Sequence, residues 1–266
     1  MTTIIVHGTF APTEDWYWNS WHDNGFCQSL SAAMVDTTGQ DDIWRVRGTP
    51  VNEIDELNPE RSFWTGSMGQ IAQQQGHFIW SGDYNAISRK LAATEFAKYL
   101  NVIRELTDEP IRIIAHSHGC NVVKQASASS KLNPQVYIDR AVFLACPHFM
   151  TDDYRQKGAF DLQQEWVGKK YLYPVQPERF GCIANMYSTR DAVVGQLADK
   201  LATSSGWEYE VPEVSFIDQD PNAVNLYENV EMKVPDHVNG TAVHGWLHGP
   251  EMGYTVGVWL ETGQFN

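Results

Sequence analysis

The sequence predicts an α/β protein with a mostly parallel central sheet and helices on both faces. Short apolar runs recur along the 266 residues, and most are followed by turn residues and then by a segment with helical spacing. Most of these runs are nearly continuous rather than alternating, as is typical of strands buried on both faces. Strand and helix therefore alternate along the chain, which favours a parallel sheet.

Six apolar runs are predicted as strands: 4–6, 77–80, 111–116, 140–146, 182–188 and 229–234. Four segments are predicted as helices: 86–106, 120–130, 193–203 and 251–260. In the first helix we expect an N-cap at Asn85 and one shared apolar face formed by Ile87, Leu91, Leu100, Ile103 and Leu106. Pro250 is expected in the first turn of the last helix, where its missing N–H costs nothing.

Two long segments interrupt this alternation, at about 37–76 and 147–181. Both exceed ordinary strand-to-helix connections, so we expect excursions from one α/β domain spanning 1–266 that form a lid or pocket wall. The segment DWYWNSW at 15–21 has four aromatic residues among seven. It fits either a loop folded back on the core or part of a ligand pocket.

The composition bounds the class of partner. The net charge of -14 disfavours nucleic acid and anionic membrane surfaces, because both would repel the chain. No run approaches about 20 apolar residues, so we expect no integral membrane association. The first strand begins almost at the N-terminus without a signal peptide, so we expect a cytoplasmic protein, with non-classical export left open. The four scattered cysteines are expected to be free thiols.

Ser117 is the candidate nucleophile, in the stretch IRIIAHSHGCNVV at 111–123. A serine needs a base to remove its proton, and a sharp strand-to-helix turn exposes its hydroxyl. Such a nucleophile elbow requires small residues two positions before and two after the serine, and these are Ala115 and Gly119. A chance serine in a turn is the alternative, but the flanking strand and helix favour the elbow.

The oxyanion hole is expected from two backbone N–H groups. His118 follows the serine at the start of a helix, where its N–H can face the developing oxyanion. The second donor is expected from Thr9, after the strand in IIVHGTF, where Gly8 lets the chain approach the nucleophile. The His116 and His118 side chains are expected to point away from the serine hydroxyl, so neither is the predicted base.

The base and its orienting acid should come from later loops. Asp191 follows the strand in CIANMYSTRDAVVG, where it could orient the base or simply cap the next helix. For the base, His244 is preferred because it lies in a loop well before Pro250. His248 remains as an alternative base or a supporting pocket residue, and His237 is a distant third.

A zinc site is the competing interpretation of His244 and His248, which are four residues apart. Gly245, Gly249 and Pro250 argue against one continuous helix there, and no glutamate completes an HExxH pattern. We therefore expect no metal.

These motifs resemble the α/β-hydrolase superfamily, in its lipase and esterase-like branch. The resemblance is carried by VHGTF, IRIIAHSHGCNVV, RAVFLACP, YSTRDAVV and the closing HGWLHGPEMGYTVGVWL. It implies a three-layer hydrolase fold and a cofactor-free triad, which falls on Ser117, Asp191 and His244, with Thr9 and His118 as oxyanion donors. Ala115 departs from the usual first glycine, and Cys120 stands where relatives often have glycine. The first strands of larger members are expected to be missing.

The expected function is hydrolysis of a small-molecule carboxylic ester, or a lipid-like one, through an acyl-enzyme. Thioester and amide hydrolysis remain open on the same triad. A catalytically silent hydrolase-like scaffold that only binds ligands is the alternative from another class. The substrate's identity and the oligomeric state do not follow from the sequence.

Overall fold

The computed structural model of the chain describes residues 1–8, 25–39, 77–78, 80–82, 86–156, 164–171, 173–194, 208–210 and 226–265. Its strands are β1 (Thr2–Val6), β2 (His77–Phe78), β3 (Ile111–His116), β4 (Ile138–Leu144), β5 (His148–Gln156), β6 (Gln164–Tyr171), β7 (Phe180–Tyr187), β8 (Glu208–Glu210) and β9 (Tyr227–Glu231). Its helices are α2 (Phe26–Thr38), α5 (Ala86–Leu106), α6 (His118–Ser127), α8 (Thr241–Trp246) and α9 (Pro250–Thr262), with a 3₁₀ turn η2 at Pro177–Arg179.

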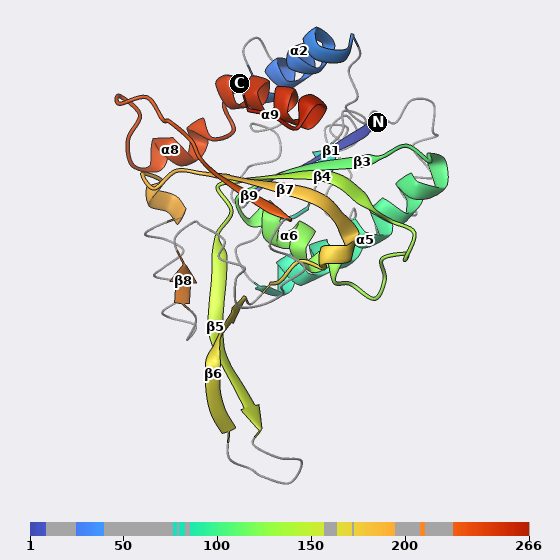
Figure 1. Cartoon of the computed structure of the whole chain (residues 1–266), viewed down its shortest axis with the longest axis vertical. Helices are drawn as coiled ribbons and strands as arrows, with labels where there is room; N and C mark the ends of the chain where they lie inside the picture. The colour runs from blue at the N-terminus through green and yellow to red at the C-terminus, as the bar shows by residue number, and fades with distance from the viewer. Residues whose placement is uncertain are drawn as a thin grey trace.

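A six-stranded sheet forms the centre of the molecule. Its order is β2-β1-β3-β4-β7-β9, and every neighbouring pair is parallel (Figure 1). The chain passes from β1 outward to β2 and then returns to the other side of β1 for β3, so the direction of winding reverses between β1 and β3. In open parallel sheets the carboxyl ends of the strands at such a reversal form the usual binding crevice.

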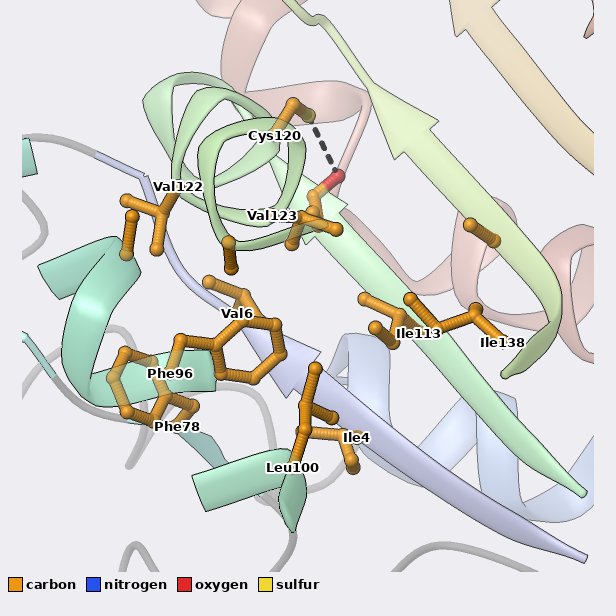
Figure 2. Packing of buried hydrophobic residues seen from close by; sticks show 14 of the residues in the cluster. Ile4, Val6, Phe78, Phe96, Leu100, Ile113, Cys120, Val122, Val123 and Ile138 are labelled. Carbon is orange, nitrogen blue, oxygen red and sulfur yellow. Dashed lines mark hydrogen bonds between the residues drawn. The ribbon is translucent and has the colours of Figure 1, made fainter. Parts of the chain in front are cut away.

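Helices cover both faces of this sheet, as the sequence predicts. Alternate side chains along each strand divide the core into two layers. Ile113 and Ala115 of β3 pack in one layer with α5 and α6, whereas Ile114 packs in the other with α2 and α9. Figure 2 shows the first layer, in which Leu100 of α5 lies beside Ile4 of β1 and Phe96 packs against Phe78. The architecture is therefore α/β with three layers.

Helix α2 was not predicted. Its sequence, FCQSLSAAMVDTT, buries Phe26, Cys27, Leu30, Ala33 and Met34. It packs against α9 so closely that a Cβ on Gly253 would lie 2.2 Å from the Phe26 carbonyl oxygen. Small and polar residues interrupt the apolar pattern of this helix. The helix still packs closely, because glycines of the partner helix leave room for it.

A second, antiparallel sheet of order β6-β5-β8 lies within and after the segment 147–181. β5 and β6 form a long hairpin that extends away from the main sheet (Figure 1). The sequence predicts this segment only as an excursion that forms a lid or pocket wall, because its polar strands lack a continuous apolar run. The other predicted excursion lies outside the described residues, except that its first residues, 37–39, end α2.

The predicted apolar face of α5 is wrong in part. Leu100 and Ile103 are buried, but Ile87, Leu91 and Leu106 are 73%, 51% and 54% exposed. The helix instead buries Ala92, Ala93, Phe96 and Ala97, because small residues let it lie close to the sheet. Asn85, the segment 15–21 and residues 195–203 of the third predicted helix lie outside the described residues.

Candidate active site

Ser117 lies in a sharp turn between β3 and α6. Its φ of 52° and ψ of -130° are unfavourable for a residue with a side chain, and such strain is held only where the surrounding structure enforces it. The Ser117 N–H donates to the Leu144 carbonyl at 2.8 Å, which ties the turn to the end of β4. A Cβ on Gly119 would lie 2.4 Å from the His7 carbonyl oxygen, so the helix can start here only with glycine.

The end of β1 lies directly against this turn. A Cβ on Gly8 would lie 2.7 Å from the Ser117 Cβ and 3.1 Å from the His116 Nδ1. His7 is held in place because its Nε2 accepts from the Trp80 N–H at 3.2 Å, while the Trp80 indole donates to the His7 carbonyl at 2.9 Å. Burial lowers the pKa of His7 to about 4, which keeps it neutral. Thr9, the predicted second oxyanion donor, lies outside the described residues.

Asp191 and His244 form a hydrogen-bonded pair. The Asp191 Oδ2 lies 2.7 Å from the His244 Nδ1, and the carboxylate is 2% exposed. Its other oxygen, Oδ1, accepts from the N–H groups of Val193 and Val194 at 2.9 and 3.2 Å. Asp191 therefore caps a helical turn and orients an imidazole at the same time. With its proton on Nδ1, His244 has a lone pair on Nε2 that can accept another proton.

His244 lies beside the turn that carries Ser117. Its ring centroid is 4.6 Å from that of His116, the residue before the serine. Burial lowers the pKa of both His116 and His118, and the next cause is His248 for His116 and Arg89 for His118. The electrostatic interaction with His244 acts in the same direction and comes third in each case. Both residues that flank Ser117 therefore interact electrostatically with His244. It comes from the short helix α8 rather than from the loop that the sequence predicts.

His248 occupies a different place in the cluster. Its ring packs edge-on against His116, with 4.3 Å between centroids, so His116 contacts both candidate bases. Burial, followed by the charge of His244, lowers the pKa of His248 to about 4. The contact with the Asp191 carboxylate belongs to His244. His237, the third candidate, is exposed in the turn before α8.

His118 opens α6, and first-turn N–H groups point out of a helix toward bound anions. Its ring stacks on Phe149 at 5.8 Å between centroids, and its Nδ1 lies 3.3 Å from the Asn121 amide nitrogen. Burial, with the charge of Arg89 second, lowers the pKa of His118 to about 3. The ring is therefore neutral at pH 7 and adds no charge beside Ser117.

Two features of the site were not predicted from the sequence. Arg89 of α5 is 3% exposed and close enough to His118 to act on its pKa. It lies in a helix with an ordinary polar pattern, so nothing in the sequence singles it out. The sequence predicts Trp80 only as a strand residue. Its hydrogen bond to His7 joins residues 73 positions apart, so the sequence does not reveal it.

The described residues contain no group of three or more His, Cys, Asp or Glu side chains arranged to hold a metal ion. None of their helices is long and apolar enough to cross a membrane. In comparisons with known proteins, no family model and no curated protein matches the chain.

Proposed function

We propose that this protein is an α/β-hydrolase-fold serine hydrolase that cleaves small-molecule or lipid-like carboxylic esters. The observation that carries the proposal is the Asp191–His244 pair, 2.7 Å apart, beside the strained turn of Ser117. The order along the chain supports it as well, because the serine follows β3, the aspartate follows β7 and the histidine follows β9. Serine, acid and histidine follow one another in this order in α/β hydrolases.

In the proposed reaction, Nε2 of His244 takes the Ser117 hydroxyl proton as the oxygen attacks the ester carbonyl. Asp191 keeps the proton of His244 on Nδ1 and stabilises the imidazolium that forms. The His118 N–H and the second backbone N–H, which the sequence predicts at Thr9, hold the oxyanion. His244 then protonates the leaving alcohol, and water releases the acyl group by the same steps.

A panel of p-nitrophenyl esters of increasing acyl length tests the activity and defines the acyl pocket. We expect Ser117→Ala and His244→Ala each to lower kcat by roughly 10³-fold or more, since these groups act as one unit. His248→Ala is the matched control and should retain most activity. If only His248→Ala abolished turnover, the assignment of the base would be wrong.

A catalytically silent binding scaffold would hydrolyse none of these esters at a rate above that of Ser117→Ala. Thioester and amide analogues of the best ester separate the three hydrolase classes. We expect the ester to give the highest kcat/KM.

A further inference from the structure

Arg190 binds the loop 232–240, which leads from β9 to α8. Its guanidinium donates from both terminal nitrogens to oxygens of the loop. The acceptors are the carbonyl oxygens of Val234 at 2.8 Å, Pro235 at 3.5 Å, Asp236 at 3.3 Å and Val238 at 2.7 Å, and the Asn239 Oδ1 at 3.0 Å. Arginine suits this role, because its N–H donors lie in one plane in a fixed fork and can bind several oxygens at once.

The two residues after Arg190 bind the same segment of the chain further along. The Ala192 N–H donates to the carbonyl of Gly240, the residue before α8, at 3.4 Å. Asp191 lies between Arg190 and Ala192, and its Oδ2 is 2.7 Å from the His244 Nδ1. Three consecutive residues therefore contact the loop, the start of α8 and the proposed base itself.

The turn that contains Arg190 is fixed to the central sheet. Ser188, which directly follows β7, is 5% exposed. Its hydroxyl accepts from the Arg190 N–H at 3.2 Å, and its carbonyl accepts from the Asp191 N–H at 3.1 Å. β7 lies two positions from β3 in the sheet, and β3 ends at the turn of Ser117. A segment bound to the 188–191 turn is therefore placed relative to the proposed nucleophile.

Helix α8 depends on such external contacts for its position. It has six residues, and its N-cap makes no side-chain hydrogen bond. Helices this short are not stable by themselves. Val243 and Leu247 are fully buried and anchor the apolar side of the helix, but apolar contacts are non-directional and fix its rotation poorly. The hydrogen bonds from residues 190–192 supply the direction, because they are made at defined atoms (Figure 1 shows α8 next to the end of β7).

We propose that Arg190 is a positioning residue, which holds the loop 232–240 so that α8 presents His244 to both Asp191 and Ser117. The role rests on the proposed function, because it concerns the base of that reaction. Arg190 acts through the backbone of the loop, so its loss should affect the proton transfer and leave substrate binding nearly unchanged. A misplacement of about 1 Å at a catalytic group can cost about 10²-fold in rate, so we expect kcat to fall about 10- to 100-fold.

Arg179 provides the matched control, because it makes the same kind of contact at the other end of β7. Its guanidinium donates to the carbonyl oxygens of Asn133 at 3.0 Å, Pro134 at 2.8 Å and Val136 at 3.3 Å. The Arg179→Ala variant therefore loses an arginine that binds a loop, but that loop leads into β4 and does not lead to His244. Any effect that both variants share reports lost stability rather than lost positioning.

Steady-state ester hydrolysis by the whole protein tests the proposal, with the folded active sites counted by titration with a fluorophosphonate. We expect Arg190→Ala to lower kcat per active site about 10- to 100-fold with KM nearly unchanged, and Arg179→Ala to keep the wild-type kcat. Arg190→Lys, the milder variant, should also lose kcat, because an ammonium cannot reproduce the forked contacts. Equal kcat in the Arg190 and Arg179 variants, or full kcat in Arg190→Lys, would overturn the proposal.

Asp236→Asn separates the backbone contacts from the charge of the loop. The Asp236 carboxylate lies 3.9 Å from the Arg190 Nη1 and is fully exposed, so this ion pair is weak. The variant removes the carboxylate and keeps the backbone carbonyl, and we expect it to retain the wild-type kcat. A loss as large as that of Arg190→Ala would contradict positioning through the backbone.

Nuclear magnetic resonance measures the contact between Asp191 and His244 without any substrate. We expect a downfield resonance from the His244 Nδ1 proton, identified by its loss in His244→Ala. This resonance should be lost or broadened in Arg190→Ala and retained in Arg179→Ala. An unchanged resonance in Arg190→Ala would overturn the proposal. If the wild type hydrolyses no ester but the resonance still depends on Arg190, the proposed function fails while the positioning of His244 by Arg190 stands.

Discussion

At the scale of the residue, Asp191 shows how one side chain meets two requirements. Its Oδ1 caps a helical turn and its Oδ2 holds His244. The sequence allows either role, because each role requires an acidic residue directly after a strand. The structure contains both, since a carboxylate has two oxygens that can accept in different directions.

We expect Asp191→Asn to lower kcat for ester hydrolysis by about 10³- to 10⁴-fold with a much smaller change in KM. The amide can still cap the helical turn through its oxygen, but it presents an N–H to His244 and favours the wrong tautomer. Steady-state kinetics with far-UV circular dichroism on the same sample measure both effects. Activity within tenfold of wild type in a folded variant would contradict the proposed role.

The residue scale also marks the limit of prediction from sequence. Ser117, Asp191, His244 and His248 all stand out from their neighbouring residues. Arg89 does not, because its burial is created by elements distant in the sequence and its own helix looks ordinary.

At the scale of the element, close packing between helices limits which substitutions the chain tolerates. A Cβ at Gly253 of α9 would lie 2.2 Å from the Phe26 carbonyl of α2, and backbone cannot move aside as a side chain can. In α8, by contrast, a Cβ at Gly245 would meet nothing within 4 Å.

Gly253→Ala should therefore lower the free energy of unfolding by about 1–3 kcal/mol, the usual cost of overpacking. Gly245→Ala, the matched control, should be neutral or should stabilise by up to about 1 kcal/mol through helix propensity. Urea denaturation of the two variants measures the difference. Equal stabilities would mean that α2 and α9 are not in close contact.

Strands were easier to predict than helices for a physical reason. A strand buried on both faces needs a continuous apolar run, as in β3, whose predicted and observed bounds agree. Helix α2 buries only part of its surface against glycines, and the hairpin of β5 and β6 is polar, so neither produces such a run.

At the scale of the whole molecule, an ion pair links the central strand to the C-terminal helix. The Arg112 guanidinium of β3 lies 2.6 Å from the Glu261 carboxylate of α9, and both side chains are 1% exposed. We expect Glu261→Gln to destabilise the protein by about 3–5 kcal/mol, because it leaves Arg112 buried without its counter-charge. The Arg112→Met, Glu261→Leu double variant should lose less stability than Glu261→Gln. Urea denaturation of both variants tests this, and a double variant less stable than Glu261→Gln would contradict it.

The buried His7 and His118 and the half-buried His248 make global stability depend on pH. Burial holds the pKa of His7 and His248 at about 4 and that of His118 at about 3, whereas about 6.5 applies in the unfolded chain. Below pH 6.5 the unfolded state binds more protons, so stability present at pH 7 falls as pH drops. Each histidine contributes up to about 1.4 kcal/mol per pH unit. Denaturation at pH 7 and pH 5 measures the loss of stability. Equal stability at the two pH values would contradict the burial of these histidines.

Labelling with a fluorophosphonate probe tests the central claim most directly. Such a probe phosphonylates a serine only where a base and an oxyanion hole activate it. We predict covalent labelling of the folded protein on Ser117, found by peptide mapping, and loss of labelling in Ser117→Ala and after unfolding. A folded wild-type protein that stays unlabelled, or that is labelled on another residue, would contradict the assignment of Ser117 as the nucleophile.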